Sequence, residues 1–275
     1  MVSRLKLVIH AVVILLICLA GSPAFGGEQR QHCLDCHRGH YVERGRCSSC
    51  HRGNPLSARR NIAHHGLVAG RFAYFTMKED AVVREGQRLM EQFSCRRCHV
   101  SAGKGNHLAT NLDSLRNQRS PEEIAASIEK PVLGMPDFSV TEQQSAILVN
   151  AILAGADSVL NSKKDRPGVV HFDDPDGQNR HVFSKKCASC HRLLSERYGA
   201  MGKGTIGPNL SGLLTRWYPR TFKNGERWND KRLQEWLRNP RKVRNWANMQ
   251  PVILSEDEFK QLVEALMINV QDQIR

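Results

Sequence analysis

The pentapeptide Cys-x-x-Cys-His occurs four times in this chain of 275 residues, at positions 33–37, 47–51, 95–99 and 187–191. The four copies contain eight of the nine cysteines, and the ninth, Cys18, lies near the N-terminus. Downstream of Cys18, no cysteine therefore remains for a disulfide framework or a thiol nucleophile. The group that these four motifs bind must therefore organise much of the fold.

Cys-x-x-Cys-His is the attachment signature of c-type haem: the two thiols form thioethers with the porphyrin, and the histidine ligates the iron. Zinc ribbons and dithiol redox pairs share the cysteine spacing. Neither alternative explains why a histidine follows the second cysteine every time. We therefore expect four covalently attached haem c groups. The expected attachment residues are Cys33, Cys36, Cys47, Cys50, Cys95, Cys98, Cys187 and Cys190, and the expected proximal ligands are His37, His51, His99 and His191.

The first 26 residues have the pattern of a secretory signal peptide. Arg4 and Lys6 precede an apolar stretch over residues 7–20, and small residues precede a cleavage point after Gly26. A membrane-spanning helix needs about 20 apolar residues, and this stretch is shorter. We therefore predict that residues 1–26 are removed and that the protein is periplasmic. Retention of the segment would instead anchor the protein to the inner membrane.

The chain is basic, with 40 lysines and arginines against 27 acidic residues. A basic excess often indicates nucleic-acid binding, but an exported haem protein rarely meets nucleic acid, so we expect no such partner. Each haem carries two propionates, which guanidinium groups pair with well. The positive charge therefore either compensates propionates within the protein or forms a docking face for an acidic redox partner or anionic lipid.

Residues 27–76 contain the first two motifs, with only ten residues between Cys36 and Cys47. The segment has too few apolar residues for a conventional core. We therefore expect a loop-rich diheme module with little regular structure, whose interior is mostly haem. It contains no methionine, which predicts histidines as the sixth iron ligands. The first candidates are His40, His64 and His65, and His32 is a secondary candidate.

Residues 77–157 and 170–275, separated by a polar linker over residues 158–169, each contain one further motif in a helical pattern. In the first of these domains an amphipathic helix is predicted over residues 79–93, ahead of the motif. Ser120, followed by proline and two acids, predicts the start of a second helix. Each domain ends on a helix that opens with a capping box, Thr141 to Gln144 in one and Ser255 to Glu258 in the other.

This order of helix, Cys-x-x-Cys-His, loop, methionine and final helix resembles class I cytochrome c domains, and the whole chain resembles multihaem c-type cytochromes. The resemblance covers most of residues 78–275, and its most specific part is Gly-Pro-Asn-Leu at residues 207–210. It implies a mainly α fold in which two tandem class I domains follow the diheme module.

The resemblance also implies methionine as the sixth ligand in both domains. Met135 would serve the haem of the third motif and Met249 that of the fourth, and both precede the last helix of their domain. Pro208 would support the fourth proximal histidine through a neighbouring carbonyl. Ala-Thr-Asn-Leu at residues 109–112 replaces Gly-Pro-Asn-Leu in the other domain. This departure leaves the support of the third histidine open and makes His107 a rival ligand.

Methionine–histidine ligation raises a haem potential relative to bis-histidine ligation. Two bis-histidine haems followed by two methionine–histidine haems therefore predict a downhill path from the N-terminal to the C-terminal modules. We therefore expect an electron-transfer protein in preference to an enzyme. It would carry electrons between a membrane quinol oxidoreductase or cytochrome and another c-type cytochrome or terminal reductase.

Two other classes remain open. One is a haem enzyme, a peroxidase or oxyanion reductase, with one open iron site. Its acid–base groups would come from the spare histidines, which are His64, His65, His107, His171 and His181. The other is a membrane-anchored cytochrome subunit of a respiratory complex.

Overall fold

The computed structural model describes residues 31–77, 79–132, 134–157 and 180–268. The predicted signal peptide, the predicted linker and His171 lie outside the described residues. Among the helices of the described residues, none combines the length and apolar character that a membrane crossing requires.

The chain divides into two compact units, one of residues 1–48 and 53–66, the other of residues 49–52 and 67–275. The first unit consists of short helical turns, and none of its described residues is buried. The turns are η1 (His32–Asp35), η2 (Val42–Arg44), the first two residues of α2 (Cys47–His51), and α3 (Arg60–Ala63). Backbone hydrogen bonds connect them, from His32 to the Pro55 carbonyl (2.8 Å) and from Asn54 to the Ala63 carbonyl (2.9 Å).

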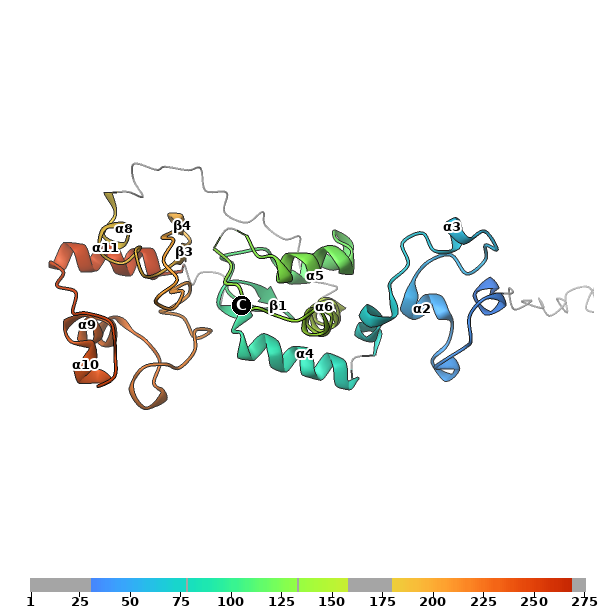
Figure 1. Ribbon diagram of the computed structural model, residues 1–275, viewed down its shortest axis with the longest axis horizontal. Helices are drawn as coiled ribbons and strands as arrows, with labels where there is room; N and C mark the ends of the chain where they lie inside the picture. Colours follow the sequence, from blue (N-terminus) through green and yellow to red (C-terminus); the bar gives the residue numbers. More distant parts are fainter. Residues whose placement is uncertain (1–30, 78, 133, 158–179, 269–275) are drawn as a thin grey trace, which may run out of the picture. The chain divides into compact units, whose positions relative to one another are not determined.

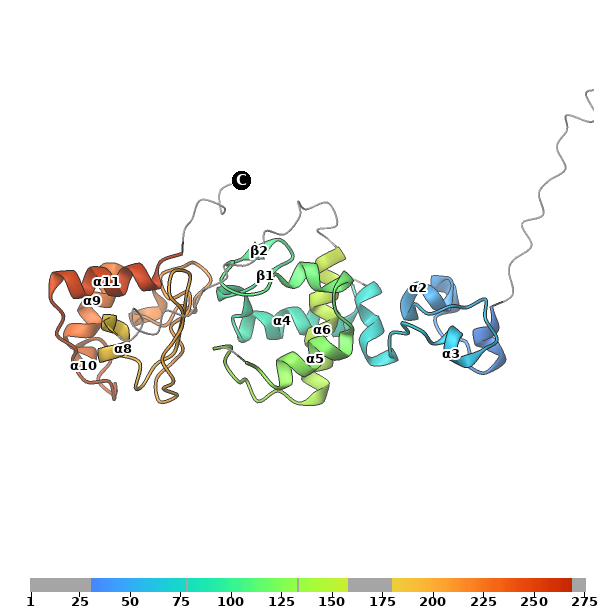
Figure 2. The ribbon, with the colours of Figure 1, turned by 90° about the horizontal axis from the view of Figure 1, so that it is seen from above.

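The second unit contains a hydrophobic cluster around α4 (Ala81–Gln92) and α6 (Glu142–Asp157), which pack against each other (Figures 1 and 2). Gly86 lies at this contact, where a Cβ would stand 2.7 Å from the Cβ of Ala151. A glycine therefore lets the two helices approach closely. The cluster is completed by η3 (Gly70–Thr76), η5 (Leu112–Asn117) and α5 (Pro121–Glu129).

The 70–76 segment, placed by its sequence at the end of the diheme module, belongs to this same core. Phe72 and Phe75 are each 1% exposed within it. Asn150 on α6 fixes the segment: its Oδ1 accepts from the Phe75 peptide N–H (2.9 Å) and its Nδ2 donates to the Arg71 carbonyl (2.8 Å). Because the amide is fully buried and paired on both sides, it specifies how the segment docks.

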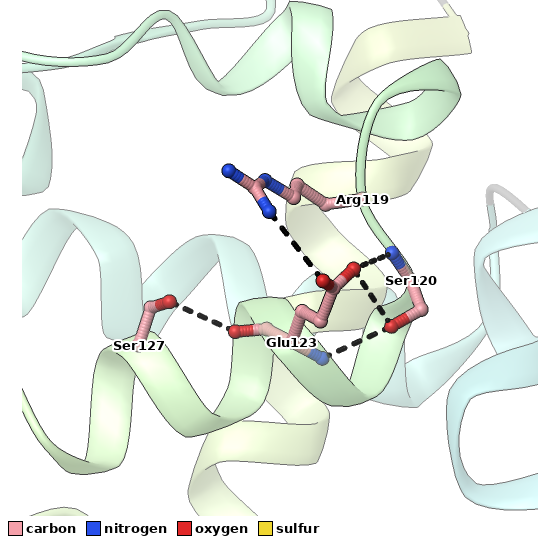
Figure 3. Close-up of polar contacts among 4 residues, drawn as sticks. All are labelled: Arg119, Ser120, Glu123 and Ser127. Atoms are coloured by element: carbon pink, nitrogen blue, oxygen red, sulfur yellow. Dashed lines mark hydrogen bonds and ion pairs between the residues drawn. The ribbon is translucent and has the colours of Figure 1, made fainter.

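Side-chain caps begin the helices at the predicted positions. In α5 the Ser120 hydroxyl accepts from the Glu123 peptide N–H (3.2 Å), and the Glu123 carboxylate accepts from the Ser120 N–H (2.8 Å), as Figure 3 shows. Thr141 and Gln144 make the same reciprocal pair ahead of α6. The helix predicted over residues 79–93 is shorter than expected, because Asp80 is the N-cap of α4.

A second hydrophobic cluster belongs to the C-terminal domain, where Phe183 is fully buried between the helices. Its elements are α8 (Val182–Lys186), η6 (Lys223–Gly225), α9 (Asp230–Arg238), α10 (Pro240–Val243) and α11 (Glu256–Leu266). The predicted capping box at Ser255 and Glu258 begins α11.

An antiparallel hairpin follows the motif in both domains. One joins β1 (Val100–Ser101) to β2 (Lys104–Gly105), and the other joins β3 (Leu193–Ser195) to β4 (Gly199–Met201). These strands were not predicted, because runs of two or three residues are too short for a period-two pattern to be visible.

Candidate functional site

The proximal histidines of the third and fourth motifs are held in the same way. His99 Nδ1 lies 2.7 Å from the Thr110 carbonyl oxygen, and His191 Nδ1 lies 2.8 Å from that of Pro208. Since a carbonyl only accepts, each Nδ1 carries the proton and each Nε2 keeps its lone pair for a metal. The support of His99, left open by the altered 109–112 sequence, is therefore provided by Thr110.

The second motif repeats this geometry, because His51 Nδ1 lies 3.0 Å from the Val68 carbonyl oxygen. The first motif differs: the His37 ring lies against that of His64, with 5.9 Å between the ring centroids. Of the other candidate ligands, His40 packs edge-on to Tyr41.

The remaining candidate histidines have other surroundings. His32 pairs with Asp35 over 2.9 Å, which orients it along its own helical turn. His65 and His107 are exposed. The structure therefore brings His64 next to a proximal histidine, His37.

The first cysteines of the third and fourth motifs, Cys95 and Cys187, lie in apolar surroundings. Burial raises the pKa of Cys95 and of Cys187 to about 11. The reactive thiolate is therefore disfavoured at neutral pH, unlike in a dithiol redox pair. None of the eight cysteines in the described residues is in a disulfide.

Two further pKa shifts agree with this chemistry. Burial lowers the pKa of His99, against the opposing effect of its hydrogen bond to Thr110, which favours the neutral imidazole that ligates metals. In the first unit, partial burial and the neighbouring Cys47 thiol raise the pKa of Cys33. Cys33 and Cys47 therefore lie close together.

The predicted methionine ligands both lie in irregular segments ahead of the last helix. Met135 lies between α5 and α6, directly after Gly134, whose φ is +85°. Met249 packs on the edge of the second cluster, and its sulfur accepts a hydrogen bond from Trp236 Nε1 (3.0 Å). Neither methionine belongs to an apolar helix stripe, and their ligation of iron stays a prediction.

The backbone and buried donors around the fourth motif fit a covalently bound haem. A Cβ at Gly204 would lie 2.5 Å from Cys190 Cα, so the chain packs tightly against the motif. Arg192 Nε and Trp217 Nε1 are buried and have no hydrogen-bond partner among the described residues. Buried donors without partners are rare, and carboxylates such as haem propionates suit them.

Comparison with known proteins gives two matches. Residues 81–152 match the family described as cytochrome C oxidase, cbb3-type, subunit III. Residues 179–267 match the family described as cytochrome c. No solved structure matches the chain. The matched segments are cytochrome c-type domains, which bind covalently attached haem c and transfer electrons.

Proposed function

We propose that this c-type cytochrome carries four covalently attached haems and conducts electrons through them, from the diheme module to two tandem class I domains. The observation that carries the proposal is the histidine–carbonyl hydrogen bond, which recurs at His51, His99 and His191. His51 lies outside both family matches. A segment that no family match covers thus holds its histidine by the same kind of hydrogen bond, which supports a haem there.

The haem, when bound, supplies an iron that takes up and gives back one electron. The residues of the chain do the rest. The proximal histidines orient the group, and their hydrogen bonds to backbone carbonyls raise the basicity of Nε2. The apolar clusters around α4 and α8 would exclude water, and the buried Arg192 and Trp217 donors would bond to the haem propionates. Nothing in this arrangement requires a bond to be made or broken.

The direction of flow follows from the ligands. The diheme segment offers histidines, with His64 beside His37, whereas each following domain offers a methionine in the expected loop. Methionine ligation raises the potential. Electrons therefore run downhill toward the C-terminal domain.

The proposed partners are redox proteins of a respiratory chain. The match to a subunit of a cytochrome oxidase supports such an association, and the net charge of +13 suits docking on acidic surfaces. We place a membrane quinol oxidoreductase upstream and another c-type cytochrome or terminal reductase downstream. We also propose a periplasmic location, with an inner-membrane anchor if residues 1–26 are retained.

Haem counting tests the central claim. In the protein expressed with its full chain, replacing both cysteines of any one motif by alanine should lower the haem content per chain from four to three. Cys18→Ala is the matched control and should leave four, because Cys18 is outside the motifs. If the haem content falls only in the variants of the third and fourth motifs, the first two motifs bind no haem. That result would contradict the diheme module and leave a two-haem cytochrome.

A potentiometric titration of the same proteins tests the direction. Removing a motif in the diheme segment should delete a low-potential component, and removing the third or fourth motif a high-potential one. The opposite order would overturn the proposed flow. Avid cyanide or CO binding by the resting protein would indicate an open iron site and favour the enzyme alternative.

A further inference from the structure

Arg97, one of the two arginines between the cysteines of the third motif, bonds to the loop that supports the fourth. Its Nη1 donates to the Asn209 carbonyl oxygen over 3.1 Å. The guanidinium lies over the Tyr218 ring, 5.7 Å from its centroid. The Tyr218 hydroxyl donates to the same carbonyl, also over 3.1 Å. Two donors from opposite domains therefore converge on one acceptor.

The side chain of Asn209 makes a second connection. Its Nδ2 donates to the Gly134 carbonyl oxygen (3.1 Å), while its Oδ1 accepts from the Ser211 peptide N–H (2.9 Å). Gly134 directly precedes Met135, the predicted sixth ligand of the third-motif haem. Asn209 directly follows Pro208, whose carbonyl supports His191. One asparagine thus connects ligand-bearing loops of both domains.

A third contact closes the set. The Asn106 amide is fully buried, and its Nδ2 donates to the Arg97 carbonyl (2.8 Å) and to Thr215 Oγ1 (3.0 Å). Gly212 allows this approach, since a Cβ there would lie 2.6 Å from the Arg97 carbonyl oxygen and the φ of Gly212 is +71°. Burying an amide is unfavourable unless it is hydrogen-bonded. The buried and paired Asn106 therefore indicates a specific contact between the two domains.

We propose that Arg97, Asn106 and Asn209 clamp the 77–157 domain to the 170–275 domain, and that they hold the third and fourth motifs in one arrangement in which an electron passes directly between their haems. The inference rests on the proposed function. Linked domains move relative to one another by default unless an interface fixes them. In the transfer, the group bound by one motif is oxidised by one electron and the group bound by the other is reduced, with no bond change. The three residues are positioning residues, because they touch the motifs and their loops.

The test compares two neighbouring arginines in the full-length haem-loaded protein. Arg97→Gln removes the contact with Asn209, whereas Arg96→Gln removes the same charge from a side chain that donates to Ser101 in its own domain. In half-reduced protein, the paramagnetically shifted haem methyl resonances report electron exchange between the two haems. Arg97→Gln should slow the exchange about tenfold, the factor expected when a charge-assisted hydrogen bond no longer holds the closed arrangement. Arg96→Gln should leave the rate near that of the native protein.

A cross-domain readout separates positioning from general destabilisation. Asn209→Ala should shift the methyl resonances of the third-motif haem, although Asn209 belongs to the fourth-motif domain. Asn229→Ala, which removes the N-cap of α9 in that same domain, should destabilise the domain and leave those resonances in place. If Arg97→Gln fails to fold, Thr215→Val removes the acceptor of Asn106 and carries the same expectation for the exchange rate.

Unchanged exchange in Arg97→Gln and in Thr215→Val, with both haems present, would overturn the clamp and leave the electron carrier intact. A native protein that lacks the third or the fourth haem would overturn the proposed function, and the clamp with it. The haem count distinguishes the two failures.

Discussion

Gly207 lies directly against the imidazole ring of His191: a Cβ at position 207 would stand 2.5 Å from Nδ1. The ring cannot turn aside without losing its 2.8 Å hydrogen bond to the Pro208 carbonyl. We predict that Gly207→Ala displaces the proximal ligand, lowers the haem content of the fourth motif and destabilises the protein by about 1–3 kcal/mol, the usual range for overpacking. Haem absorbance and urea unfolding of the same samples measure both effects.

Gly70→Ala is the matched control for this substitution. A Cβ at Gly70 meets no atom within 4 Å, so its effect on the free energy of unfolding should stay within about 0.5 kcal/mol, as at ordinary surface positions. Normal haem content and stability in Gly207→Ala would mean that the His191 ring has room to shift, contrary to its observed packing.

The predicted methionine ligands can be tested by exchange for histidine. Met135→His and Met249→His should each lower one midpoint potential by on the order of 0.1 V, within the roughly 0.8 V range that axial ligands span. Met267→His is the control, because Met267 is 56% exposed and lies after α11. If a ligand-site variant titrates like Met267→His, that methionine does not bind iron.

Local chemistry made some of this structure predictable from the sequence. The capping boxes at Ser120 and Ser255 mark the starts of α5 and α11, because a cap involves residues only three positions apart. The Cys-x-x-Cys-His motifs are equally local. Where the amphipathic pattern alone was used, as for residues 79–93, the predicted ends differ by a residue or two from the α4 bounds Ala81–Gln92.

The rest depends on contacts that leave no local signal. The support of His99 comes from the backbone carbonyl of Thr110. Every residue has a backbone carbonyl, so no side chain in the sequence marks this one. The hydrogen bond from Arg97 to Asn209 joins residues 112 positions apart. The role of Gly86 could not be predicted either, because it depends on the close contact with Ala151 of another helix.

Asn150 should be the most costly polar residue to remove from the core around α6. Asn150→Ala leaves the buried Phe75 N–H without its partner and removes a hydrogen bond from the Arg71 carbonyl. We predict a loss of about 1–3 kcal/mol in the free energy of unfolding, the cost of one orphaned buried group. Asn117→Ala, at an exposed position of η5, should cost under about 0.5 kcal/mol. Similar costs for the two variants in urea unfolding would show that the Asn150 contacts contribute little.

His181 gives the C-terminal domain a pH-dependent stability. It is the N-cap of α8, where its Nδ1 accepts a hydrogen bond from the Phe183 N–H over 3.0 Å. Burial lowers the pKa of His181 from its usual 6.5, and Arg197 acts in the same direction. The nearby Gln261 backbone and the charge of Glu264 oppose the shift. The neutral ring is therefore the form that the folded domain prefers.

Because the pKa of His181 is lower in the folded domain, the unfolded chain takes up its proton first as the pH falls. The stabilising contribution is fully present above the unfolded pKa of about 6.5 and is lost as the pH falls from there through the folded value. We predict that His181→Asn, which can still cap the helix, loses less stability than the native protein between about pH 7 and pH 5. Urea unfolding at both pH values measures the difference. Equal losses in the two proteins would mean that His181 titrates alike in the folded and unfolded chains, and that its cap tolerates a proton.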